Sequence, residues 1–97
     1  MSRANRKDKN HNAIADALRD AGATVKDMTG DESIGFDLLV GYRGVLYMLE
    51  VKYGDKPPSR RRLTPNEMKT YADFARVGVR YHIVLDEDDA LRAIGAI

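Results

Sequence analysis

Two short runs of strand-forming residues, joined by four turn-forming residues, constrain this chain more than any other feature. The runs cover 36–40 and 45–51, and the connection at 41–44 reads Gly-Tyr-Arg-Gly. Two such runs separated by a short, glycine-containing connection indicate a β-hairpin. The sequence therefore predicts an antiparallel strand pair near the middle of the chain.

The register of this hairpin decides which side chains share a face of the sheet. With the two glycines of the turn opposite each other, Asp37 faces Met48, and directly paired residues point to the same side. Glu50 and Lys52 follow Met48 at intervals of two residues, so they share that side. We therefore expect Asp37 and Glu50 to be diagonal neighbours, with Cβ atoms about 7–8 Å apart. A three-residue turn would separate the group.

The rest of the chain predicts three helices and two further strands around the hairpin. Apolar residues at helical spacing, a capping box at 64–67 and an acidic cap at Asp86 mark the three helices. The helix that the capping box opens carries Met68 and Tyr71 on its apolar face. The expected elements are a helix over 10–21, a strand over 23–28, a loop over 29–35, a helix from 65, a strand over 79–85 and a last helix from 87. The order α-β-β-β-α-β-α predicts an α/β fold with a mixed sheet flanked by helices.

Length and composition limit the classes of protein that the chain can belong to. Its 97 residues fit a single domain over 1–97, in which the polar residues 1–9 are expected to form a flexible basic arm. The chain has no cysteine, which excludes a disulfide framework, a thiolate nucleophile and a cysteine-based zinc site. No apolar run approaches the roughly 18 residues of a membrane span, so no membrane contact is expected.

The residues Asp37, Glu50 and Lys52 suit metal-assisted phosphodiester chemistry. Two carboxylates held close together repel each other, and a hard cation such as Mg²⁺ relieves that repulsion. The backbone carbonyl of Val51 is a plausible further ligand, and Lys52 could orient a water molecule or offset charge on the phosphate. The alternative is structural, because a Glu-x-Lys pair on a strand is often only a cross-strand ion pair.

Three segments together resemble the PD-(D/E)XK nuclease superfamily, in particular the small VRR-NUC and Holliday-junction-resolvase-like proteins of phages and bacteria. They are Phe-Asp-Leu-Leu-Val-Gly at 36–41, Leu-Glu-Val-Lys at 49–52 and Leu-Thr-Pro-Asn-Glu at 63–67. The resemblance implies a restriction-endonuclease-like fold and a DNA substrate in the cytoplasm of a bacterial or phage-infected cell. It also implies a Mg²⁺ or Mn²⁺ ion held by Asp37, Glu50 and the Val51 carbonyl, no organic cofactor, and Lys52 as the catalytic lysine.

The chain departs from the pattern of that superfamily in its first helix, where members often carry an acidic or amide residue that completes the metal site. The corresponding segment here begins Asn10-His11, so these two residues are candidate auxiliary ligands acting through a water molecule. Glu67 is a third auxiliary candidate, since members often have Glu or Gln at this place. Its alternative role is to cap the helix that begins after Thr64.

Two clusters of basic residues are candidates for DNA binding. They lie in the arm and after the second hairpin strand, and they comprise Arg6, Lys7, Lys9, Lys56, Arg60, Arg61 and Arg62. A charge run is often only a solvated loop, but its place after the catalytic strand favours phosphate contacts. A single small domain further favours a homodimer that cuts branched or flapped DNA. The main alternative is an inactive DNA-binding module of the same fold.

Overall fold

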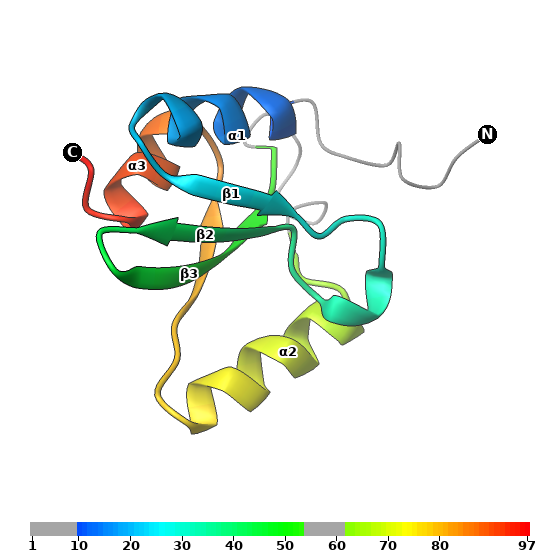
Figure 1. Cartoon of the computed structure of the whole chain (residues 1–97). Helices are drawn as coiled ribbons and strands as arrows, with labels where there is room; N and C mark the ends of the chain where they lie inside the picture. The colour runs from blue at the N-terminus through cyan, green and yellow to red at the C-terminus, as the bar shows by residue number, and fades with distance from the viewer. Residues whose placement is uncertain (1–9, 54–61) are drawn as a thin grey trace.

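A four-stranded mixed sheet is the centre of the computed structural model, which describes residues 10–53 and 62–97 (Figure 1). The order α-β-β-β-α-β-α predicted from the sequence is confirmed, with one 3-10 turn added in the loop before the hairpin. The elements are α1 (His11–Asp20), β1 (Thr24–Asp27), η2 (Glu32–Ile34), β2 (Leu38–Tyr42), β3 (Val45–Val51), α2 (Pro65–Arg76), β4 (Tyr81–Val84) and α3 (Glu87–Ala93). No helix in this part of the chain is long and apolar enough to cross a membrane.

The sheet has the strand order β1-β2-β3-β4. The first three strands form an antiparallel meander, and β4 pairs with β3 in parallel. Because parallel neighbours need a crossover connection, the chain passes through α2 between β3 and β4. This arrangement brings β4 and the start of α2 beside the end of β3.

The hairpin register differs from the expected one by two residues. Leu38 faces Leu49 and Tyr42 faces Val45, so the turn consists of Arg43 and Gly44 alone. Both turn residues have positive φ, 49° and 82°, as a two-residue hairpin turn of the primed kind requires. A shift of two residues keeps every side chain on its predicted face, because side chains alternate with a period of two.

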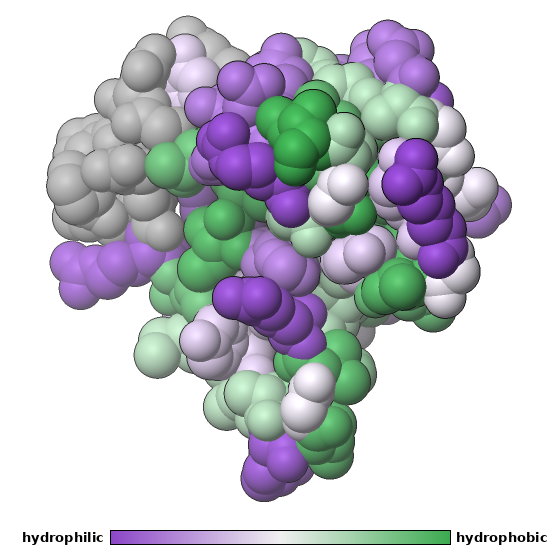
Figure 2. Space-filling model, turned by 90° about the vertical axis from the view of Figure 1, so that its left-hand side faces the viewer, coloured by the Kyte–Doolittle hydropathy of each residue, from purple (hydrophilic) through white to green (hydrophobic). Residues whose placement is uncertain are grey.

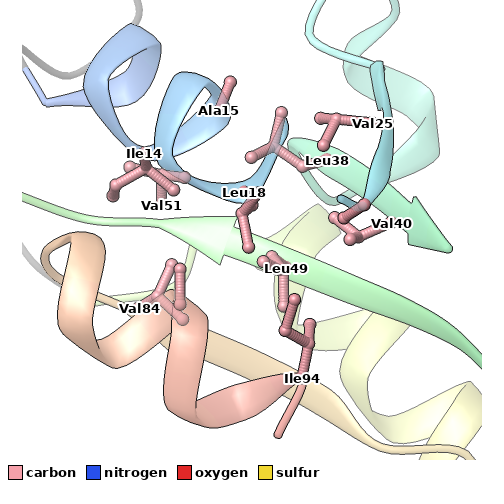
Figure 3. Close-up of a cluster of buried hydrophobic side chains, with 12 residues drawn as sticks. Ile14, Ala15, Leu18, Val25, Leu38, Val40, Leu49, Val51, Val84 and Ile94 are labelled. Carbon is pink, nitrogen blue, oxygen red and sulfur yellow. The ribbon is translucent and has the colours of Figure 1, made fainter. Parts of the chain in front are cut away.

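The hydrophobic core lies between the sheet and the two helices α1 and α3, which cover one face together (Figure 3). Leu38, Val40, Leu49 and Val51 point toward this core from the two hairpin strands. Ile14 and Leu18 of α1 and Ile94 at the end of α3 meet them, with Val25, Val84 and Ala90 also buried. The opposite face of the sheet is therefore the one that carries Glu50.

Helix α2 lies on that opposite side, against η2 and β4, and none of its residues is buried. Met68 and Tyr71 of its predicted apolar face are 59% and 45% exposed, although the ring of Tyr71 packs against that of Tyr81. The helix touches the sheet mainly at its first turns, so its apolar stripe is only partly covered. Val77, the residue after α2, is 69% exposed. Hydrophobic surface is visible in the lower part of Figure 2.

Gly35 is the residue at which α2 and the segment before β2 approach most closely. Its φ is +82°, and a Cβ atom added to it would lie 2.1 Å from Thr70 Oγ1. A left-handed conformation costs an L-residue roughly 1–2 kcal/mol, and the clash adds to that cost. We therefore expect Gly35→Ala to lower the free energy of unfolding by about 2 kcal/mol. Urea denaturation measures this, with Gly30→Ala as the control because a Cβ at Gly30 meets nothing within 4 Å; equal stability of the two variants would contradict the prediction.

Candidate active site

Asp37 stands just before β2, at the end of the hairpin, where the backbone fixes it from both sides. Its N–H donates to the carbonyl of Leu49 at 3.1 Å, and its carbonyl accepts from the N–H of Met28 at 2.7 Å. Its carboxylate Oδ2 accepts the N–H of Val51 at 2.8 Å. Continuing the register of the hairpin by one pair sets Asp37 directly opposite Glu50, not diagonal to it as the sequence suggested.

Glu50 and Lys52 project from the last part of β3 into a largely buried space beside α2. Their exposed fractions are 2% and 9%. Lys52 Nζ lies 3.3 Å from Glu50 Oε2 and 3.0 Å from Glu67 Oε1. Asp37, Glu50 and Lys52 therefore share one end of one face of the sheet, as predicted, and Glu67 joins them from another element.

Glu67 performs the predicted capping role, and its carboxylate also contacts Lys52. Its Oε1 accepts the N–H of Thr64 at 2.9 Å, while its own N–H donates to Thr64 Oγ1 at 3.2 Å. These two bonds form the capping box that begins α2. The same Oε1 accepts a hydrogen bond from Lys52 Nζ, so the start of α2 holds the lysine.

The carboxyl groups of the site are costly to ionise in this protein. The pKa of Glu50 is raised to about 9, first by burial and then by the nearby charges of Asp37 and Glu67, against the lowering effect of Lys52. Burial also raises the pKa of Asp37, although the hydrogen bond from Val51 offsets part of this effect. Desolvation without enough compensating positive charge is the common cause.

Lys52 and Glu67 form the ionised pair of the cluster. Burial lowers the pKa of Lys52, but its bonds to Glu67 and Glu50 outweigh burial, and the pKa lies above its ordinary value. Burial likewise raises the pKa of Glu67, but hydrogen bonds from Glu50, Thr64 and Lys52 outweigh it, so that the pKa is lowered. Lys52 is therefore a cation and Glu67 an anion at neutral pH.

Tyr81 of β4 is a residue of the site that sequence reasoning missed. Its hydroxyl donates to the carbonyl of Gly35 at 2.6 Å and lies 3.4 Å from Glu50 Oε1. The signal that would have identified it is the pairing of β4 with β3, because Tyr81 faces Met48 and so shares the side of Glu50. A strand pattern alone does not reveal which strands become neighbours.

The two auxiliary candidates at the start of α1 have structural contacts. His11 is 2% exposed, and its Nε2 lies 3.1 Å from Asp27 Oδ2. The side-chain amide of Asn10 donates to the carbonyls of Leu85 and Lys52, which ties the start of α1 to the ends of β3 and β4. Asn10 Oδ1 is buried and accepts no hydrogen bond from the residues that the structure describes.

Of the predicted DNA-binding residues, only Arg62 belongs to the part of the chain that the structure describes, and it is exposed. It lies two residues before Thr64, the residue that caps α2. The others, Arg6, Lys7, Lys9, Lys56, Arg60 and Arg61, lie outside the described residues.

The donor set of this site fits a hard divalent cation such as Mg²⁺ or Mn²⁺. Asp37 and Glu50 offer carboxylate oxygens, and Val51, which follows Glu50 in the sequence and bonds Asp37 through its N–H, offers a backbone carbonyl. Across residues 10–53 and 62–97, no three histidine or acidic side chains are grouped closely enough to form a metal cage. Mg²⁺ needs no such cage, since it keeps several waters and often uses only one or two carboxylates.

Comparison with known proteins identifies the fold. No protein-family model matches the chain, and no curated protein matches it. A solved structure described as a VRR_NUC domain superposes with a TM-score of 0.62 at 22% sequence identity, covering 89% of this chain and 90% of that one. At this identity the likeness establishes the fold, so the restriction-endonuclease-like, VRR-NUC-type fold predicted from the sequence is confirmed.

Proposed function

We propose that this chain is a metal-dependent endonuclease that hydrolyses phosphodiester bonds in DNA. The observation that carries the proposal is the position of Lys52 Nζ, 3.3 Å from Glu50, in a buried cluster that also contains Asp37. Carboxyl groups whose pKa values are raised by burial and by neighbouring charges are concentrated at catalytic sites, where they lie close to a partner of defined charge. The VRR-NUC-type fold agrees with this assignment.

In the proposed reaction, each side chain has a separate task. Asp37, Glu50 and the Val51 carbonyl would hold Mg²⁺ or Mn²⁺, which supplies a Lewis acid for the phosphate and lowers the pKa of a bound water. Lys52 donates hydrogen bonds toward the negative charge that develops on the phosphate. Glu67 keeps the lysine ammonium directed at the site and charged. No organic cofactor is needed for this chemistry.

The substrate we propose is branched or flapped DNA, cut by a homodimer. The domain is small, with a radius of gyration of 12.8 Å, and offers little surface for reading a long sequence. Arg62 beside the site would contact phosphate, as would the basic residues at 3–9 and 56–61. Two copies would present two sites to a junction. We place this activity in the cytoplasm of a bacterial or phage-infected cell.

A second candidate function is that of a DNA-binding module without catalysis. It is favoured by the small number of ligands, since only two carboxylates of the described residues face the proposed ion and Glu67 is engaged by Lys52 and Thr64. Such a module would bind DNA with a strong dependence on salt concentration and would cleave it in no divalent metal.

The proposal predicts that the wild-type protein binds Mn²⁺ and that Asp37→Asn weakens this binding at least about tenfold. The amide keeps the size of the side chain and the bond from Val51 but loses the charge that attracts the ion. Titration with Mn²⁺, followed by electron paramagnetic resonance, measures the affinity. Cleavage of junction, flap, nicked and linear DNA is then assayed in Mg²⁺ and Mn²⁺.

Asp16→Asn is the matched control, because Asp16 is an exposed aspartate of α1 whose partner is Arg19. It should bind Mn²⁺ like the wild type. A wild-type protein that binds DNA but neither Mn²⁺ nor Mg²⁺ would support the binding module instead. Metal-dependent cleavage that is equally strong in Asp37→Asn would reject the assigned site.

A further inference from the structure

Glu50 is held at both of its carboxyl oxygens by different elements. Oε2 faces Lys52, and Oε1 faces the hydroxyl of Tyr81 at 3.4 Å. Tyr81 is 7% exposed, and its ring packs against that of Tyr71 with 5.5 Å between the centroids. The phenol is therefore fixed by packing. Its oxygen restricts how far the carboxyl group of Glu50 can move toward β4.

The same hydroxyl reaches the segment that carries Asp37. It donates to the carbonyl of Gly35 at 2.6 Å, two residues before Asp37. A phenol has one hydrogen, and the Gly35 carbonyl can only accept, so the bond to Gly35 uses that hydrogen. Tyr81 thus lies between the backbone that presents one carboxylate and the side chain of the other.

Helix α2 holds this segment against Tyr81 from the other side. Thr70 Oγ1 donates to the carbonyl of Ile34 at 3.2 Å, and the side-chain amide of Asn66 donates to the carbonyl of Glu32. Gly35 is packed so closely on Thr70 that no larger residue fits without movement. The segment before Asp37 therefore has little freedom, and the phenol bonds it to β4 of the sheet.

We propose that Tyr81 is a positioning residue for the metal site, which sets the separation of Asp37 and Glu50 through its bond to Gly35 and its contact with Glu50. This inference rests on the proposed function of the two carboxylates. Residues that orient metal ligands from behind typically change metal affinity about 10–100-fold when they are replaced. Tyr81 itself would touch neither the ion nor the DNA.

The test is Tyr81→Phe, which removes one oxygen atom and keeps the ring. We expect the Mn²⁺ concentration for half-saturation to rise about tenfold, measured without DNA by electron paramagnetic resonance. We also expect cleavage to need about ten times more metal, but to approach the wild-type rate at saturating metal. A general loss of structure would lower the rate at every metal concentration.

Tyr47→Phe is the matched control, because the Tyr47 hydroxyl donates to the carbonyl of Ile94 at 3.3 Å and touches no carboxylate of the site. It loses a similar bond and should keep the wild-type metal dependence. Wild-type affinity in Tyr81→Phe would overturn the inference while leaving the proposed function intact. Absence of metal binding in the wild type would instead remove the proposed function.

A measurement on the wild-type chain covers the case in which Tyr81→Phe does not fold. The ¹³C chemical shift of the Gly35 carbonyl should change as Mg²⁺ is added, because Tyr81 links this carbonyl to Glu50. The midpoint of this change should equal the midpoint of Mg²⁺ binding measured independently. The Ile94 carbonyl, which accepts from Tyr47, should not respond. A Gly35 shift that stays constant up to saturation would overturn the inference.

Discussion

Lys52→Ala is expected to lower the rate of DNA cleavage at saturating Mg²⁺ by about 10²–10³-fold. Lys52 lies inside the cluster of Glu50 and Glu67, so alanine would leave the developing charge on the phosphate without its proposed hydrogen-bond donor. Metal binding should not weaken. The loss of a positive charge 3.3 Å from Glu50 makes the remaining carboxylates more attractive to a divalent ion.

A lower cleavage rate with undiminished metal affinity distinguishes the loss of a catalytic lysine from damage to the metal site. Single-turnover cleavage with excess enzyme gives the rate, and Mn²⁺ titration gives the affinity. Lys69→Ala is the control, since Lys69 is an exposed lysine of α2 paired with Asp73. Lys52→Met adds a variant that keeps most of the buried chain length. Cleavage by both Lys52 variants at the wild-type rate would mean that the activity resides elsewhere.

Glu50→Gln is expected to make the metal-free protein more stable at alkaline pH while it removes metal-dependent cleavage. The pKa of Glu50 is raised from 4.5 to about 9 in the folded chain, mainly by burial. A raised pKa means that the folded state binds the proton more tightly, so its stability is complete below pH 4.5 and is lost as the pH rises toward 9. One pKa unit corresponds to about 1.4 kcal/mol, which sets an upper limit of about 6 kcal/mol for the loss.

Thermal unfolding in EDTA between pH 5 and 9 measures this effect. For a domain of this size, about 1 kcal/mol shifts the melting temperature by roughly 4–8 °C, so the wild type should lose well over 10 °C across the range. Glu50→Gln should lose far less, and Mg²⁺ should restore the wild type at high pH by binding the ionised form. Asp16→Asn serves as the control. Parallel melting curves of wild type and Glu50→Gln would show that Glu50 is not the titrating group.

The face of the sheet that carries the site could be predicted from the sequence, although the register could not. A turn with glycines at 41 and 44 is compatible with two registers that differ by two residues, and side-chain alternation is the same in both. Asp37, Glu50 and Lys52 therefore stay together in either register. The two-residue turn at Arg43 and Gly44 depends on a positive φ at an arginine, which composition alone does not indicate.

Other parts of the site depend on the order of the strands, which no local pattern encodes. Tyr81 reaches Glu50 only because β4 lies beside β3. Sequence reasoning set capping by Glu67 against a role in the site, but the carboxylate that caps α2 also reaches Lys52, since a side chain in the first turn of a helix can face inward. The apolar residues of α2 followed helical spacing, yet that spacing does not say whether a neighbour covers them.

The double use of Glu67 Oε1 limits how this protein can be altered. One oxygen atom accepts both the N–H of Thr64, which begins α2, and the ammonium of Lys52. A substitution at position 64 or 67, whether engineered or acquired in evolution, therefore changes the environment of Lys52 together with the stability of the helix start. The stability of the helix start and the catalytic role proposed for Lys52 are coupled, and changing one without the other requires substitutions elsewhere in the domain.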